Sequence, residues 1–158
     1  MAKTLIVNNT PYEYPTEGDA PGWGADATGW AESVTEVLSN LQGPNDILET
    51  SFSIANNQIT LADVTGLSFN AGSVRSSRIN YSIFRISDSN PSGNAESGVI
   101  DIVYDNNVGW LMAQGDTVGF AGCIFAITPA GQFRYTSSDI GSLNYIGEMR
   151  FYAKSIQQ

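Results

Sequence analysis

The residues Ser77-Arg-Ile-Asn-Tyr-Ser-Ile-Phe-Arg-Ile86 form the clearest strand pattern in this chain. Apolar and polar residues alternate through Ile79, Tyr81 and Ile83, and a period of two is typical of a strand with one buried face. A second alternating run occupies residues 117–128. Shorter runs of β-forming residues lie at 47–54, 58–61, 98–104, 108–113, 132–137 and 145–156. About eight strands separated by turn signals predict a mainly β fold, an antiparallel β-sandwich or jelly roll.

One polar stretch between these runs, Asp88–Glu96, raises the question of a cation site. Its Asp, Asn, Ser and Gly residues match the first ligand positions of a calcium-binding loop. The position that needs a bidentate Glu is Val99, and no helices flank the stretch. A plain hairpin loop is therefore favoured, and no metal is predicted.

The chain is predicted to have two parts: an acidic arm with a helix at residues 1–45, and the β-sandwich domain at 46–158. The first fifty residues carry eight acidic residues and one basic residue. Three of the six prolines fall between residues 11 and 21, which predicts that Pro11–Gly24 is extended and is not a ladder strand. One helix is predicted from Thr28, as the N-cap, to about Leu41, with Gly43-Pro44 as its stop. Its apolar stripe consists of Trp30, Val34, Val37, Leu38 and Leu41.

Composition excludes several classes of function. A net charge of −9 opposes binding of nucleic acid, because phosphate contacts require Lys and Arg. The chain has no histidine, so it can build neither a Ser-His-Asp triad nor a His-ligated zinc site. Its one cysteine, Cys123, lies in an apolar run and is predicted to be buried and inert. We therefore expect no enzyme, no catalytic residues and no cofactor.

Localisation follows from hydropathy. No apolar stretch approaches the roughly 20 residues that span a bilayer, so no membrane partner is expected. The N-terminal residues do not resemble the hydrophobic region of a signal peptide, which predicts synthesis in a reducing cytoplasm.

The charged residues of the predicted strands allow two further interpretations. Carboxylate pairs for acid–base chemistry could form among Asp63, Asp101, Asp105 and Glu148, but no local spacing singles out a pair. A basic set consists of Arg134, Arg150 and Lys154. This set could complement the acidic arm of another subunit, although solvated strand faces are the simpler interpretation.

Four large aromatic rings lie close together in the arm and helix: Tyr12, Tyr14, Trp23 and Trp30. Tyr and Trp are common anchors at interfaces because they bury a large area at low entropic cost. The sequence leaves two possibilities open. The arm docks on a partner protein or a neighbouring subunit, or it folds back onto its own sandwich.

Two segments resemble a known class of protein. The first is Pro11-Tyr-Glu-Tyr-Pro15-Thr-Glu-Gly18-Asp-Ala-Pro21-Gly-Trp-Gly24 together with Thr28-Gly-Trp-Ala-Glu-Ser-Val-Thr-Glu-Val-Leu38, which resembles the N-terminal arm and helix of small structural proteins of tailed bacteriophages. The second is Gly131-Gln-Phe-Arg-Tyr-Thr-Ser-Ser138 with Tyr145-Ile-Gly-Glu-Met-Arg-Phe-Tyr-Ala-Lys154, which is similar to the closing strands of phage trimeric jelly-roll modules.

The resemblance implies a virion protein without catalytic residues. It implies a homotrimeric capsid decoration (cement) protein that binds the phage major capsid protein on the capsid exterior and stabilises the shell. The aromatic and apolar residues of the closing strands are then candidates for the core or the trimer interface; they are Phe133, Tyr135, Met149 and Phe151.

The alternative is a receptor-binding tip of a tail fibre or head fibre that binds host surface glycan. A tip is usually attached to an extended shaft, so the small size favours the cement protein. A tip also predicts that the loops at Asp88–Glu96 and Asp105–Val108 cluster at one exposed end.

Overall fold

The computed structural model describes residues 3–7, 10–14, 24–41 and 43–158. The chain divides into two compact units, Met1–Pro44 and Asn45–Gln158. Each unit is described below on its own.

The first unit contains a β-hairpin and one helix. Strand β1 (Lys3–Val7) pairs antiparallel with β2 (Thr10–Tyr14), and Pro11 lies opposite Ile6. The prediction that the arm contains no ladder strand was therefore wrong for residues 11–14. Proline can occupy a two-stranded hairpin because every second N–H of such a strand points away from its partner and needs no ladder acceptor.

Helix α1 spans Gly24–Leu41. It begins four residues before the predicted N-cap Thr28, because Ala25 and Ala27 are strong helix formers and Asp26 lies in the first turn, where the helix dipole favours an acid. The predicted end is confirmed, since the helix stops before Gly43-Pro44.

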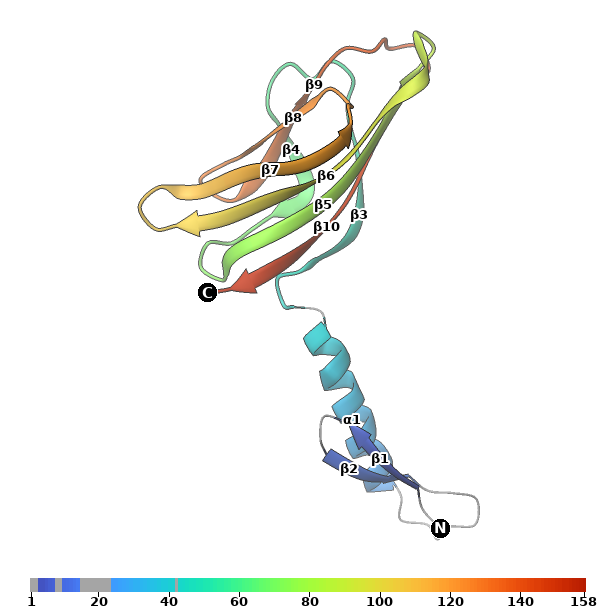
Figure 1. Ribbon diagram of the computed structural model, residues 1–158, viewed down its shortest axis with the longest axis vertical. Coiled ribbons are helices and arrows are strands. Elements are labelled where there is room, and N and C mark those ends of the chain that lie inside the picture. The colour runs from blue at the N-terminus through green and yellow to red at the C-terminus, as the bar shows by residue number, and fades with distance from the viewer. Residues whose placement is uncertain (1–2, 8–9, 15–23, 42) are drawn as a thin grey trace. The chain divides into compact units, whose positions relative to one another are not determined.

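The second unit is an antiparallel β-sandwich, as predicted (Figure 1). Its five-stranded sheet has the order β3-β10-β5-β6-β7, and its three-stranded sheet has the order β4-β9-β8. The strands are β3 (Ile47–Ser53), β4 (Ala62–Ser68), β5 (Val74–Ser87), β6 (Asn90–Asp105), β7 (Gly109–Gly119), β8 (Cys123–Ile127), β9 (Gln132–Ser137) and β10 (Ile146–Gln157).

Rings from both sheets meet between the layers. Tyr81 of β5 packs edge-on against Phe125 of β8, with ring centroids 5.3 Å apart. Phe52 of β3 packs in the same way against Tyr135 of β9, at 5.5 Å. The alternating residues of the central strand β5, including Ile79, point into this shared core. Burial of these faces is the main force that holds the two sheets together.

Three strand predictions need correction. Residues 58–61 do not form a strand, and the strand lies at Ala62–Ser68 instead. The run at 108–113 and the start of the run at 117–128 form one continuous strand, β7. The chain then leaves the large sheet after Gly119 and enters the small sheet at Cys123. Alternation alone does not reveal this change of sheet, because the period of two continues across it.

The predicted hairpin loop at Asp88–Glu96 is much shorter than expected. Strand β5 pairs with β6 as far as Ser87 opposite Asn90, so only Asp88 and Ser89 lie between the strands. The pairing continues through polar residues because a bulge, with Gly93 at φ +69°, absorbs the irregularity.

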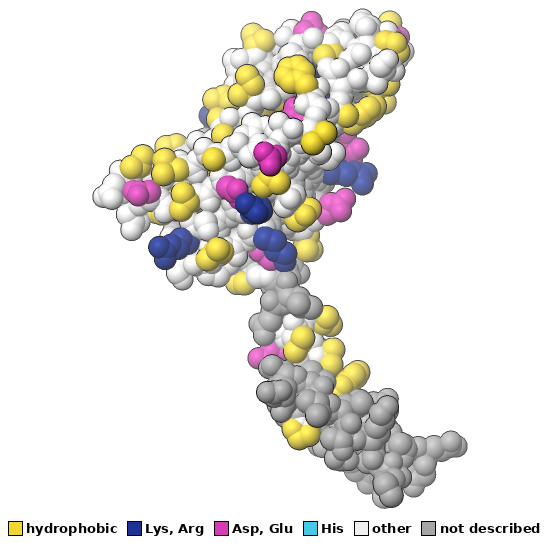
Figure 2. All heavy atoms as spheres, in the orientation of Figure 1, with side chains coloured by type: hydrophobic (Ala, Val, Ile, Leu, Met, Phe, Trp, Pro, Cys, Tyr) yellow, Lys and Arg dark blue, Asp and Glu magenta, His cyan; other side chains and the backbone are white. Residues whose placement is uncertain are grey.

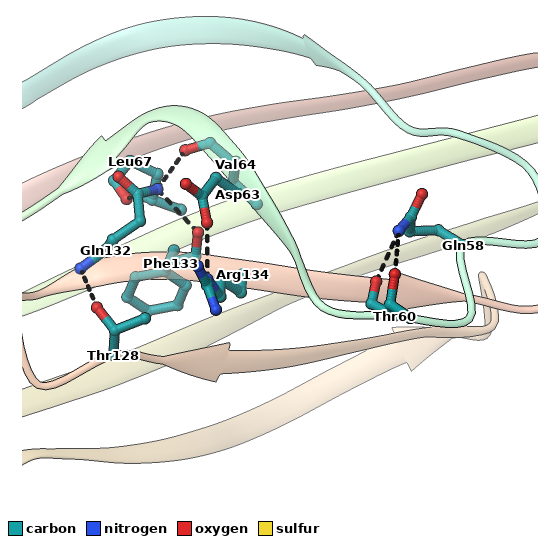
Figure 3. A network of polar contacts seen from close by, with 9 residues as sticks. All are labelled: Gln58, Thr60, Asp63, Val64, Leu67, Thr128, Gln132, Phe133 and Arg134. Carbon is teal, nitrogen blue, oxygen red and sulfur yellow. Dashed lines mark hydrogen bonds and ion pairs between the residues drawn. The ribbon is translucent and has the colours of Figure 1, made fainter.

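A glutamine side chain completes the small sheet where β4 departs from regular pairing. The register shifts between Asp63, opposite Arg134, and Ser68, opposite Gln132. The Gln132 amide nitrogen donates to the carbonyls of Val64 at 3.0 Å and Leu67 at 3.3 Å (Figure 3). The side chain thus replaces ladder hydrogen bonds that the bulge removes.

None of the helical residues described in this structure form a segment that is long and apolar enough to span a membrane.

Candidate interaction surface

The segment Gly119-Phe120-Ala121-Gly122 links the two sheets. Both glycines have positive φ, +85° at Gly119 and +67° at Gly122. A Cβ atom on Gly119 would lie 2.2 Å from the carbonyl oxygen of Ala95, and one on Gly122 would lie 2.2 Å from the Ser138 hydroxyl. Only glycine satisfies both the backbone conformation and the close approach.

Two buried charged side chains hold the peptide groups of Ala121. The Ala121 N–H donates to the Glu96 carboxylate at 2.9 Å, and the Ala121 carbonyl accepts from the Arg85 guanidinium at 2.6 Å. The neighbouring Phe120 N–H donates to the carbonyl of Ala95 at 2.9 Å. The backbone on either side of the Phe120 side chain is therefore fixed in place.

Arg85 ties this segment to three other parts of the sandwich. Its side chain is 0% exposed. Besides Ala121, its guanidinium donates to the Ser138 carbonyl, to the Asn56 side chain at 3.2 Å and to the Tyr145 hydroxyl at 3.0 Å. Every one of these acceptors is uncharged. Glu96, on the other side of the Ala121 peptide, provides the opposite charge.

Glu96 is also part of a buried hydrogen-bond chain. Its carboxylate accepts from the Tyr81 hydroxyl at 2.7 Å, and that hydroxyl accepts from the Gln114 amide at 2.7 Å. Burial, together with the hydrogen bond to Glu96, raises the pKa of Tyr81 well above its ordinary value. The hydroxyl therefore remains a proton donor to Glu96 at any physiological pH.

This rigid frame presents three exposed apolar side chains. Ile59 is 82% exposed, Phe120 is 72% exposed and Ile124 is 70% exposed. Together they line a shallow hollow of about 390 Å³ on the outer side of the small sheet. We call Ile59, Phe120 and Ile124 the Phe120 surface. The hollow has no charged lining residue, and its polar residues include Gln58, Thr136 and Ser138.

Hydrogen bonds also hold the backbone on either side of Ile59. The Gln58 N–H donates to the Ser137 hydroxyl at 3.1 Å, and the Ser137 N–H donates back to the Gln58 carbonyl at 2.9 Å. The Gln58 side chain then donates to the Thr60 carbonyl at 2.7 Å, which bridges Ile59 (Figure 3).

Cys123 lies at the edge of this hollow and is buried, as predicted. Burial raises the pKa of its thiol to about 11, and the nearby Arg85 offsets only part of the increase. The thiol is thus protonated at neutral pH, which is the unreactive form.

The sequence did not identify the Phe120 surface. Phe120 belongs to the alternating run at 117–128, where its position predicts a buried side chain. The available signal was the pair of glycines at 119 and 122, because two glycines around one aromatic residue are typical of a backbone that needs positive φ.

The four candidates for the core or the trimer interface all lie in the core of the single chain. Phe133, Tyr135, Met149 and Phe151 are buried between the two sheets. They are therefore not available on the surface for contact with another subunit.

The aromatic residues of the arm are described only in part. Trp30 lies on α1 and is half-buried. Tyr12 and Tyr14 lie on β2, but their side chains are outside the described part of the structure. Trp23 is outside the described residues altogether.

Three of the four candidate carboxylates pair with basic residues, and none of the four pairs with another. Asp63 binds Arg134 at 2.7 Å, and Asp101 binds Arg78 at 2.8 Å. The remaining members of the predicted basic set are also paired, Arg150 with Glu148 and Glu49, and Lys154 with Asp46. Asp105 instead accepts hydrogen bonds within the β6–β7 turn. Figure 2 shows oppositely charged side chains beside one another on the visible face of the sandwich.

These pairs lower the pKa of two of the carboxyl groups. The hydrogen bond from Arg78 lowers the pKa of Asp101 below its ordinary value, and hydrogen bonds from Ser51 and then Arg150 lower that of Glu148. Asp101 is paired with Arg78, and Arg150 lies between Glu148 and Glu49, so the acid–base pairs considered among Asp63, Asp101, Asp105 and Glu148 do not form. Among the residues that the structure describes, no cluster of three potential metal ligands is present.

Comparison with known proteins gives a likeness in structure and none in sequence. No family model matches the chain, and no curated protein matches it. The tailspike protein of an Acinetobacter phage is similar in structure, with a TM-score of 0.41 and 12% identity over 70% of this chain. The similar region makes up 20% of the tailspike chain. A likeness at this level assigns no function, and no residue role is transferred from it.

Proposed function

We propose that this chain is a non-enzymatic structural protein of a phage virion, a capsid decoration protein. In this proposal a homotrimer binds the major capsid protein on the capsid exterior and stabilises the shell. Two observations support this proposal. The arm, the helix and the closing strands resemble phage structural proteins, and the sandwich carries the exposed apolar Phe120 surface.

The Phe120 surface is the observation that supports a contact function. Three large apolar side chains are exposed together on a backbone that a buried network holds rigid. An exposed apolar patch with a polar rim is typical of protein–protein contact, whereas ligand and active sites enclose convergent polar groups. Rigid presentation lowers the entropy lost on association.

The alternative function, a receptor-binding tip, predicts two loops clustered at one end, and this chain does not have that arrangement. The Asp88-Ser89 turn precedes β6 and the Asp105–Val108 turn follows it, so these loops lie at opposite ends of that strand (Figure 1). They form no cluster at one exposed end. A decoration protein requires no such cluster.

Shell binding is the direct test of the proposed function. The full-length protein would be weighed by native mass spectrometry and then mixed with undecorated phage shells. We expect a trimer that cosediments with the shells and raises the temperature at which they break. A fragment of residues 45–158, compared in parallel, reports whether the N-terminal unit is the part that holds the shell.

Two results would contradict the proposal. A protein that has no affinity for any shell is not a decoration protein. A trimer that ignores shells but adsorbs to bacterial cells and blocks infection would instead support the receptor-binding tip.

A further inference from the structure

We propose that copies of this chain associate through the Phe120 surface, which lies on the three-fold axis of the trimer. The inference rests on the proposed function, because it names the interface of the homotrimer proposed there. It leaves the other surfaces of the chain, including its N-terminal unit, for contact with the shell.

The first argument is the fixed position of Phe120. Arg85 and Glu96 hold the two sides of the Ala121 peptide, and the flanking glycines pack directly on Ala95 and Ser138. A fully buried arginine and a buried glutamate thus hold a segment whose aromatic side chain is in water. A prearranged aromatic side chain is the typical centre of an interface, because little entropy is lost when its partner arrives.

The second argument is charge, and it selects a copy of the same chain as the partner. Identical groups meet one another at a symmetry axis, so a charged residue there meets its own charge. Residues 45–158 carry ten acidic and six basic residues, so a face of the sandwich without charged residues is the one best suited to self-contact. The hollow at the Phe120 surface is lined by uncharged residues. The outer face of the large sheet, by contrast, carries the Arg78–Asp101 and Lys154–Asp46 pairs.

The third argument is the layout of the surface. Ile59, Phe120 and Ile124 form an apolar centre, and Gln58, Thr136 and Ser138 form a polar rim. An apolar core with an uncharged polar rim is the usual anatomy of a protein–protein interface. Three side chains cover less than the roughly 800 Å² that each partner of a stable complex buries. Flanking regions of each copy must therefore contribute as well.

Native mass of surface variants tests the inference. We expect Phe120→Ser, and more completely Phe120→Ser with Ile124→Ser, to reduce a wild-type trimer to single chains of 16.9 kDa. The matched control is Val108→Ser, because Val108 is 70% exposed but lies at the other end of β7. This control should stay trimeric. Near-UV circular dichroism of each variant, which arises mainly from the Trp and Tyr side chains, checks that the fold is intact.

Cross-linking gives a second measurement that keeps the Phe120 side chain in place. A Thr136→Cys chain in a Cys123→Ala background carries its one thiol at the rim of the hollow, and it should form covalent dimers on mild oxidation and never larger species, because one thiol per chain permits one bond. Val108→Cys in the same background should not form them.

The outcomes separate this inference from the proposed function. A Phe120→Ser chain that is still trimeric, with no cross-linking at position 136, overturns the inference and leaves shell binding untouched. A wild-type chain that is monomeric overturns the inference and the trimeric part of the proposed function together. Shell binding of the wild type is measured separately and decides the remainder.

Discussion

At the scale of single residues, the molecule depends on a buried cation without a carboxylate in contact. Arg85 has only uncharged acceptors, and the Glu96 charge acts on it across the Ala121 peptide. Burying the Arg85 guanidinium and the Glu96 carboxylate costs desolvation energy for both groups. The arrangement is stable because every N–H donor of the guanidinium has an acceptor. The result is a precise position for several loops at one end of the sandwich.

Removing the Arg85 guanidinium should strongly destabilise the sandwich. We expect Arg85→Met to destabilise the sandwich by about 3 kcal/mol or more, because the carbonyls of Ala121 and Ser138 lose their donor and Glu96 loses its countercharge. Urea denaturation measures the change. Arg75→Met is the control, since Arg75 is exposed and has no ion pair among the described residues; it should change stability by less than about 0.5 kcal/mol. Equal midpoints for the two variants would contradict the structural role given to Arg85.

The carboxyl of Asp139 should make stability depend on pH. The Gly141 N–H, and after it the Asn56 side chain, lower the pKa of Asp139 below its ordinary value of 3.8. A pKa that is lower in the folded state means a contribution to stability that is present above the unfolded pKa and lost as the pH falls through the folded one.

We therefore expect Asp139→Asn to lower the denaturation midpoint at pH 7. The difference from the wild type should shrink as the pH falls below 3.8. Asp116→Asn serves as the control, because Asp116 is exposed on β7 and accepts no hydrogen bond from the described residues. If the Asp139→Asn difference were constant from pH 7 to strongly acidic pH, the ionised carboxylate would not be its cause.

At the scale of elements, the crossing from β7 to β8 carries the candidate surface. Its path depends on Gly119, whose position combines positive φ with contact to the backbone of Ala95. Gly109, at the other end of β7, has a similar φ of +90° but nothing within 4 Å of a Cβ atom. Substituting alanine at Gly109 therefore tests backbone strain alone, and substituting it at Gly119 tests backbone strain together with steric overlap.

The comparison of these glycines is a direct test of the crossing. We expect Gly109→Ala to cost about 1–2 kcal/mol from the left-handed conformation alone. Gly119→Ala should cost at least about 1 kcal/mol more, because the Ala95 backbone cannot move aside. Chemical denaturation of both variants measures the difference. Should the two substitutions prove equally costly, the close approach of β6 to the crossing would not limit this segment.

At the scale of the whole molecule, the described residues that form the buried core of the sandwich all belong to the second unit. A unit with a complete core of its own is expected to fold independently.

We expect the fragment of residues 45–158 to unfold at the same temperature as the sandwich in the full chain, within about 2 °C. Differential scanning calorimetry of the fragment and the full chain measures this. A fragment that melts far lower would show that the first unit stabilises the sandwich.

Much of this architecture can be predicted from residue patterns. Alternation through Ile79, Tyr81 and Ile83 is enough to predict a β-sandwich, and the apolar stripe with its Gly43-Pro44 stop is enough to predict the helix. These features are local, because propensity and periodicity act over a few neighbouring residues. The burial of Cys123 follows equally from its apolar neighbours.

The candidate surface around Phe120 could not be predicted from local patterns, and the cause is physical. Whether Phe120 faces the core or the solvent depends on the change of sheet at Gly119–Gly122, and that change is held by Arg85 and Glu96, which lie far away in the sequence. The same holds for Phe133 and Met149, whose burial depends on the opposite sheet. A pattern of residues reports that a side chain is apolar, and only the packing of distant strands determines what covers it.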